Sequence, residues 1–192
     1  MRPDWTTDSL PGLAATIWSE LDRSAGDPTH PWRTPGLATL DASGPQVRTV
    51  VLRATDLAQR QLVAFSDARA TKVSQLIGEQ RAQWLFHDSA QRLQLRATTT
   101  VQVHQADDVV RRYWESVPES NRRNYRSLQS PGAVLSRPEE GRARLPDSAA
   151  AQFAVLCATV TELDWLWLAD TGHRHARFRW QNEAWQGDWL VP

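Results

Sequence analysis

The fold is decided by four segments: RTVVLR at residues 48–53, VAFSDARATK at residues 63–72, QWLFHD at residues 83–88 and LQLR at residues 93–96. The first two contain β-type runs of branched and aromatic residues, and both carry cations. A loop of small residues ends the second segment at Lys72. The third and fourth segments are again β-type, and the fourth places Gln94 between two leucines. This region therefore predicts several short strands joined by tight turns.

The same pattern continues on both sides of this region. We expect a hairpin over residues 36–56 with Ser43–Pro45 in its turn, and strands over residues 62–66, 81–87, 92–104, 153–168, 174–180 and 183–189. Strands outnumber helices and do not alternate with them one for one, which argues against a doubly wound parallel sheet. The sequence favours an α+β fold, a mainly antiparallel β-barrel with peripheral helices.

Helices are expected at four places. The first covers residues 9–22, with Ser9 as the cap and Leu13, Ile17 and Leu21 in one apolar stripe. The second covers residues 70–76, with Val73, Leu76 and Ile77 on the buried side. A third helix begins at Asp107, and Pro118 begins a further helical turn. A chain of 192 residues is long enough for one domain and short for two, so residues 1–192 are predicted to form a single domain.

Bulk composition limits the function classes. Lysine plus arginine equals aspartate plus glutamate at 22 each, which disfavours a nucleic-acid partner because phosphates require a surplus of cations. Cys157 is alone in the apolar run QFAVLCATV, as expected of a buried thiol in a reducing compartment. The first residues lack the apolar core of a signal peptide, and no run approaches the roughly 20 apolar residues of a membrane span. A cytoplasmic protein without a membrane partner is expected.

The cations of the first two segments have two interpretations each. Arg48 and Arg53 lie five residues apart, so on a regular strand they would point to opposite faces and one of them could reach a phosphate. The alternative is that both are surface charges, as most arginines on strands are. Ser66, Thr71 and Lys72 surround a helix start and would suit an anion, although an ordinary helix cap explains them about equally well. No Walker sequence is present.

Three other polar residues are candidates for binding. Gln94 presents a donor and an acceptor together, or it is an exposed strand amide. His173 and His175 are expected on one face of a strand, where they contact an anion or substrate or simply meet solvent. A metal site is not predicted, because no third ligand stands beside the two histidines. No nucleophile motif is present, and no catalytic acid or base is assigned.

Taken in order, the segments resemble the pyridoxamine 5′-phosphate oxidase family over roughly residues 33–192. RTVVLR resembles its R-x-V-L-L-K strand, LQLR its R-Q-V-R strand, and Trp185 with the closing WLVP its C-terminal end. The resemblance implies an FMN-binding split barrel that acts as a homodimer, with FMN at the subunit interface. The cofactor contacts that it implies are Arg48, Thr49, Val50, Val51, Leu52, Arg53, Phe65, Ser66, Thr71, Lys72, Gln94, Gln129, Ser130, Trp167 and Arg177.

The substrate contacts depart from the family pattern. The resemblance assigns these contacts to Arg53, Tyr113, His173 and His175. However, Val117 stands where the family has an arginine, and Asn121 stands near the position of a family serine. His173 likewise replaces a second family arginine. Beside Lys72 the family has a second basic residue, for which Arg69 is a nearby substitute. Intact flavin contacts with altered substrate contacts resemble an uncharacterised flavin-binding branch more than a true vitamin B6 oxidase.

The resemblance therefore implies an FMN-dependent oxidoreductase that transfers hydride between flavin and a small-molecule substrate. Pyridoxamine or pyridoxine phosphate and a nicotinamide are open substrate classes. The alternatives are a non-catalytic flavin- or haem-binding split-barrel protein and a structural dimer without cofactor.

Overall fold

The computed structural model describes residues 3–146 and 151–192 of the chain. Its helices are α1 (Leu10–Gly26), α2 (Thr71–Gly78), α3 (Asp108–Ser116) and α4 (Glu119–Arg122), with short 3-10 turns η1 (Pro31–Arg33), η2 (Arg123–Tyr125) and η3 (Pro138–Arg142). Its strands are β1 (Gly36–Asp41), β2 (Gly44–Thr49), β3 (Leu52–Asp56), β4 (Gln61–Asp67), β5 (Arg81–Asp88), β6 (Leu93–His104), β7 (Phe153–Trp167), β8 (Arg174–Gln181) and β9 (Ala184–Leu190). The predicted mainly antiparallel sheet with peripheral helices is confirmed.

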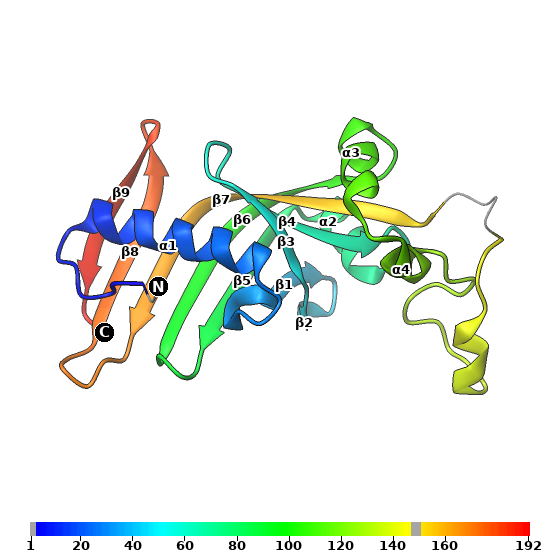
Figure 1. The fold of residues 1–192 in the computed structure, drawn as a ribbon, viewed down its shortest axis with the longest axis horizontal. Helices are drawn as coiled ribbons and strands as arrows, with labels where there is room; N and C mark the ends of the chain where they lie inside the picture. The colour runs from blue at the N-terminus through cyan, green and yellow to red at the C-terminus, as the bar shows by residue number, and fades with distance from the viewer. Residues whose placement is uncertain (1–2, 147–150) are drawn as a thin grey trace.

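The strands form one sheet in the order β2-β1-β5-β6-β7-β4-β3, in which every described pairing is antiparallel. Strand β7 pairs with β6 over its length, and its other edge pairs first with β4 and then with β8. The register shifts between Thr98 and Thr99 of β6, where this change of neighbour occurs. The sheet is split at this point, with the β8–β9 hairpin on one side and β3–β4 on the other (Figure 1).

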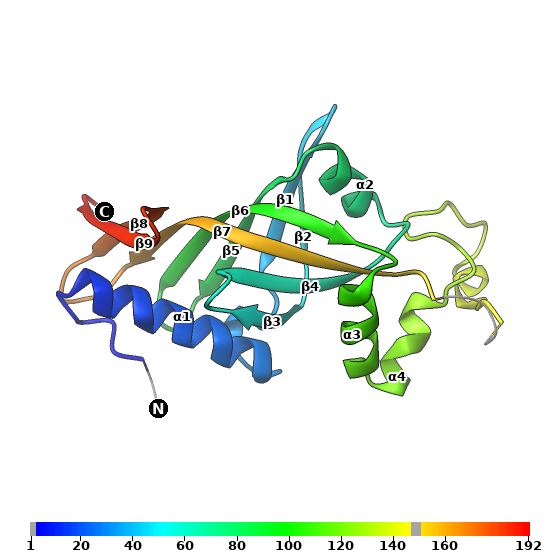
Figure 2. The same ribbon diagram turned by 90° about the horizontal axis from the view of Figure 1, so that it is seen from above.

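The helices flank this sheet, and α1 and α2 lie on opposite sides of it (Figure 2). Helix α1 begins where Ser9 accepts a hydrogen bond from the Gly12 amide, and Leu13, Ile17 and Leu21 are fully buried against the sheet. The predicted stripe is confirmed, and the helix runs four residues beyond the predicted end. In α2, Val73 and Leu76 are buried, but Ile77 is 62% exposed, so its predicted place on the buried side is wrong. An eight-residue helix has room for only a narrow apolar stripe.

Two apolar clusters fill the molecule on opposite faces of β4 and β7. Leu62 and Ala64 belong to the larger cluster and Val63 to the smaller, as the period of two along a strand requires. The larger cluster contains Trp5, Trp18, Trp32, Trp84 and Trp165, which are therefore core residues. Cys157 lies buried in the smaller cluster, as the sequence predicts. Among the described residues, no helix is both long and apolar enough to cross a lipid bilayer.

We expect Gly187→Ala to destabilise the fold. A Cβ at Gly187 in β9 would lie 2.8 Å from the ring of Phe178, which is fully buried in the core, and 3.3 Å from Cβ of Leu10. Overpacking of this kind costs about 1–3 kcal/mol. Urea unfolding measures the loss. The matched control is Gly78→Ala at the end of α2, where an added Cβ meets no atom within 4 Å. Equal stabilities of the two variants would contradict the prediction.

Candidate functional site

Lys72 is the only lysine of the chain and lies in the first turn of α2. Its side chain is partly buried, and it makes no hydrogen bond or ion pair with the residues that the structure describes. Burial lowers the pKa of its ammonium group, and the charge of Arg48 lowers it further, while Asp67 opposes both. An ammonium group in this setting gains from a bound anion.

Arg48 on β2 is the second cation beside this loop. Its guanidinium donates to the hydroxyl of Thr39 and, over 3.0 Å, to Oε1 of Gln75, while Nε2 of Gln75 donates to the carboxylate of Asp41. These contacts fix Arg48 in place without neutralising it directly, and burial lowers its pKa. Arg48 and Lys72 therefore form a pair of neighbouring cations from two different elements.

Other polar residues of the loop between β4 and α2 have structural contacts. Arg69 forms an ion pair of 2.7 Å with Asp67 and donates to the carbonyls of Ser127 and Leu128. Its guanidinium is therefore engaged, rather than free to substitute for a second cation beside Lys72. Ser66 is buried, and its hydroxyl donates to the carbonyl of Asp67 over 3.0 Å.

The contacts of Arg69 also join two predicted parts of the site. Gln129 and Ser130 follow directly after Leu128, and both line a shallow depression that also includes Asp67. Thr71, the first residue of α2, is exposed. The predicted anion loop and the Gln129–Ser130 loop are thus neighbours in the fold.

The segment from residue 48 to residue 53 is divided between two strands. Strand β2 ends at Thr49 and β3 begins at Leu52, and the amide of Val50 donates to the carbonyl of Pro35 over 3.0 Å. Arg48 and Arg53 therefore do not share a regular strand, so the predicted alternation between them does not apply. Leu52 is fully buried in the core, which leaves only its backbone for a ligand, and Thr49 is exposed.

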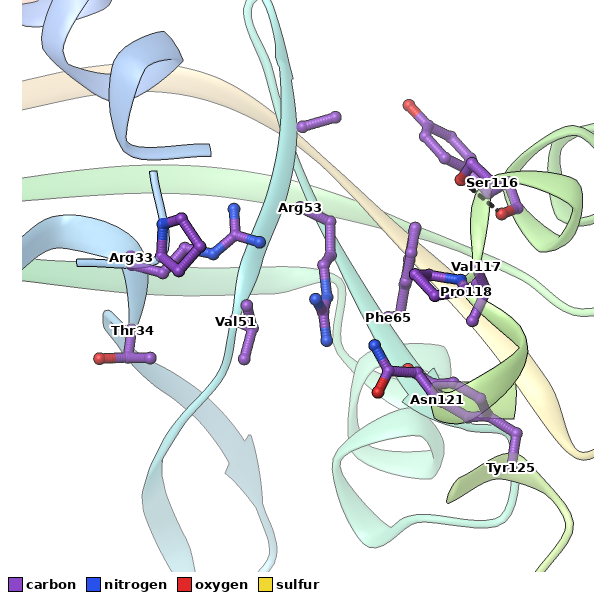
Figure 3. A pocket seen from close by; sticks show the side chains of 13 residues that line it. Arg33, Thr34, Val51, Arg53, Phe65, Ser116, Val117, Pro118, Asn121 and Tyr125 are labelled. Carbon is purple, nitrogen blue, oxygen red and sulfur yellow. Dashed lines mark hydrogen bonds between the residues drawn. The ribbon is translucent and has the colours of Figure 1, made fainter. Parts of the chain in front are cut away.

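A pocket of about 680 Å³ opens beside β3 and β4, between η1 on one side and α3 and α4 on the other (Figure 3). Arg53 extends into it between Arg33 and Phe65, and its guanidinium carbon lies 5.7 Å from the centre of the Phe65 ring. Nε of Arg53 is buried without a hydrogen-bond partner among the described residues. Tyr113 lines the same pocket, with its ring 5.4 Å from that of Phe65.

Three predicted residues lie elsewhere on the sheet. Gln94 pairs with Leu166 and Arg177 with Asp164, so Gln94 and Arg177 share one face of the sheet. Trp167 points to the opposite face, where its Nε1 donates to the carbonyl of Gln91 over 3.1 Å. Nε of Arg177 is buried without a hydrogen-bond partner among the described residues.

This second group is distant from the pocket. Phe65 pairs with Val155, and Gln94 pairs with Leu166 eleven residues further along β7. At about 3.3 Å per residue, the separation along the strand is roughly 35 Å. One chain therefore does not bring the Gln94 group to the pocket that contains Arg53.

His173 and His175 border a different, open depression with Arg174 and Trp189. Strand β8 begins at Arg174, so His173 precedes the strand, and the predicted placement of both histidines on one strand face is wrong. Nδ1 of His175 lies 3.1 Å from the carbonyl oxygen of Val191. The described residues contain no group of three or more metal-ligating side chains.

The pocket residues that sequence reasoning missed include Arg33 and Tyr125. Arg33 follows a proline-rich connection without periodicity, and Tyr125 lies in a single 3-10 turn. Neither segment carries a motif, so only the folded structure brings these side chains beside Arg53.

Comparisons with known proteins match this architecture. Residues 15–105 match the family model described as pyridoxamine 5′-phosphate oxidase, FMN-binding domain. A pyridoxine/pyridoxamine 5′-phosphate oxidase of Agrobacterium fabrum is 28% identical over 148 residues, which are 77% of this chain and 67% of that protein.

Two crystal structures share the fold over nearly the whole chain. A pyridoxamine 5′-phosphate oxidase-related FMN-binding protein of Nostoc punctiforme has a TM-score of 0.77 at 20% identity and covers 97% of this chain and 100% of its own. PhzG of Burkholderia lata, solved in complex with tetrahydrophenazine-1-carboxylic acid, has a TM-score of 0.75 at 16% identity and covers 100% and 98%. The predicted split-barrel fold is confirmed.

We expect Cys157 to be nearly inert in the folded protein. Burial raises the pKa of this thiol to about 11, which at pH 8 leaves roughly a hundredth of the thiolate present at its ordinary value. Iodoacetamide labelling at pH 8, followed by mass spectrometry, should be at least about a hundredfold slower in buffer than in urea. Comparable rates in the two solvents would show that the smaller cluster is open to solvent.

Proposed function

We propose that the protein is an FMN-dependent oxidoreductase acting on a small molecule, on the premise that residues 15–105 match the family model of the pyridoxamine 5′-phosphate oxidase FMN-binding domain. The observation that carries this proposal is the neighbouring cation pair of Arg48 and Lys72, close in the fold to a pocket with its own arginine. The first pair suits the phosphate of a cofactor, and the pocket suits a substrate.

The chain's own residues fit FMN. Lys72 lacks a hydrogen-bond partner among the described residues and is desolvated beside Arg48, so a phosphate would relieve the repulsion between the two cations. Arg53 also carries a buried Nε atom without a described partner, on the pocket side of the same region. Lys72 and Arg48 would hold the phosphate, and Val51 and Phe65 would bound the remaining part of the cofactor.

The separation along β7 supports a homodimer. Gln94 and Arg177, which share one face of the sheet, would serve the site of a second copy, since roughly 35 Å of strand separates Gln94 from the pocket in their own chain. The buried Nε of Arg177, which lacks a partner among the described residues, fits such a contact. Each site would then take its phosphate contacts from one copy and further contacts from the other.

Bound FMN would supply the redox chemistry, while the protein binds, orients and excludes water. Phe65, Val51 and Val117 give the pocket apolar walls, and Arg53 places a positive charge within it. The residues of the pocket include no histidine or carboxylate, so no proton-transfer role is assigned to a side chain there. The buried, unpaired thiol of Cys157 fits a cytoplasmic location, which we also propose.

The absorption spectrum of the purified protein distinguishes this proposal from its alternatives. Flavin bands that bleach with a reductant and return in air are expected for an oxidoreductase. A flavin that binds but exchanges electrons with no donor would favour a storage or sensing protein, and a Soret band would indicate haem.

We predict that Lys72→Ala weakens FMN binding by about 1.5–3 kcal/mol, the scale of a hydrogen bond to a charged group. Quenching of FMN fluorescence on titration measures the dissociation constant. Lys72→Arg keeps the charge and should lose less affinity. The control is Arg111→Ala on the exposed face of α3, where the side chain contacts only Asp108 among the described charges. An unchanged FMN affinity in Lys72→Ala would remove Lys72 from the site.

We also predict complementation between two defective chains. If Lys72 and Arg177 serve one site from different copies, Lys72→Ala and Arg177→Ala chains should each bind FMN poorly as homodimers. Their heterodimer, isolated through two different affinity tags, should regain a single tight site, because one of its sites combines both native residues. If both residues served the same site from one chain, the heterodimer would bind FMN no better than either parent.

A further inference from the structure

The pocket beside β3 and β4 contains two arginines and, among the described residues, no acidic side chain within ion-pair distance of either. Arg33 enters from η1 and Arg53 from β3. Burial lowers the pKa of Arg33, and the charge of Arg53 lowers it further, so the two guanidinium groups repel each other in a partly desolvated space. Such an arrangement favours an anionic ligand, because the chain does not supply the countercharge at ion-pair distance.

Arg33 is already partly engaged. Its Nη1 donates to the carbonyl oxygens of Ala25 and Ser24 at the end of α1, which fixes the side chain in position. Arg53 is different: its Nε atom is buried and has no described hydrogen-bond partner. The hydroxyl of Tyr125 interacts with Arg53 and lies on the same side of the pocket as Phe65. Arg53 therefore brings to the wall of the pocket a guanidinium group that no described carboxylate neutralises at ion-pair distance.

The walls around Arg53 suit a flat ring. The centre of the Phe65 ring lies 5.7 Å from the guanidinium carbon of Arg53, and Figure 3 shows Phe65 and Tyr125 on the same side of Arg53. Val51 and Val117 add further apolar surface. Aromatic rings pack favourably against aromatic and branched side chains of this kind, and the volume of about 680 Å³ is in the range of small-molecule sites.

The donor set fits a carboxylate better than a phosphate ester. A carboxylate presents two oxygens in one plane and matches the fork of a single guanidinium. A phosphate group carries more oxygens out of that plane, and each would need a donor. On the side of the pocket that α3 and α4 form, Pro118 has no amide hydrogen, the amide of Val117 donates to the carbonyl of Trp114, and the Ser116 hydroxyl donates to the carbonyl of Tyr113, so these three groups offer no free donor.

We propose that this pocket takes a planar aromatic carboxylate, whose carboxylate is paired by Arg53 with support from Arg33 and whose ring packs between Phe65, Tyr125 and Val117. That this ligand is the substrate class of the flavin site rests on the proposed function. Binding of the carboxylate to the pocket can be measured independently of turnover.

The test uses three matched probes, 2-naphthoate, 2-naphthamide and 2-naphthyl phosphate, titrated calorimetrically into the FMN-loaded full-length protein. We expect 2-naphthoate to bind at least about tenfold more tightly than the neutral amide and more tightly than the phosphate. Arg53→Lys retains the charge but loses the planar fork, and should weaken 2-naphthoate binding roughly tenfold. Arg111→Lys on α3 is the matched control and should leave the affinity unchanged.

A gain-of-function variant keeps the test informative if Arg53 variants fold poorly. Asn121→Arg adds a third cation at the partly exposed edge of the pocket and should shift the preference towards 2-naphthyl phosphate. Tighter binding of the phosphate than of the carboxylate to the native protein would overturn the inference, as would equal affinity for the carboxylate and the amide. A protein that binds 2-naphthoate at Arg53 but no FMN would contradict the proposed function and leave the pocket assignment standing.

Discussion

Strand β7 is the constraint on which the rest of the molecule depends. It is fifteen residues long, and it keeps β6 as a neighbour on one edge while its other edge passes from β4 to β8. Its first half is buried on both faces, since alternate residues enter the two apolar clusters. Cross-strand pairing of β7 with β6 therefore joins two half-sheets, with one shift of register where they meet. The pocket with Arg53 belongs to one half and the Gln94 and Arg177 pair to the other.

The charges are distributed unevenly, although the chain is neutral as a whole. Many surface arginines pair with a carboxylate close by in sequence, as Arg81 does with Glu79 and Arg111 with Asp108. Exposed pairs of this kind contribute little to stability. Arg48, Lys72 and Arg33 instead lie partly buried, where desolvation lowers their pKa values, and the neighbouring charges of Arg48 and Arg53 lower those of Lys72 and Arg33 further.

Local periodicity was sufficient to predict most elements of the fold. The alternation of Ala82, Trp84 and Phe86 with polar residues identified β5, and the helical stripe identified α1. The register between strands could not be predicted in this way, because a period of two specifies a face and not a partner. Periodicity therefore did not reveal that Gln94 and Trp167, both implied as flavin contacts by the family resemblance, lie on opposite faces of the sheet.

The candidate site was predictable in part. Lys72 and Arg53 were implied by the resemblance to a known family, whose motif spacing survives in a linear sequence. Arg33 and Tyr125 come from irregular turns that reach the pocket only through tertiary packing, so no local pattern announces them. His173 was misplaced for a related reason: β8 begins at Arg174, as the strand predicted over residues 174–180 does, so His173 lies before the strand, where the two-residue alternation of side chains does not apply.

The use of lysine only once has a consequence for proteolysis. A protease specific for lysine has a single internal bond to attack, between Lys72 and Val73, and Val73 is buried against the core within the first turn of α2. Cleavage there requires α2 to detach locally from the sheet, and it produces two fragments whose sizes are known in advance. When local opening and closing are fast relative to cutting, the cleavage rate reports the population of that opened state. Cleavage at Lys72 thus measures the fraction of molecules in which the start of α2 is detached from β1 and β6.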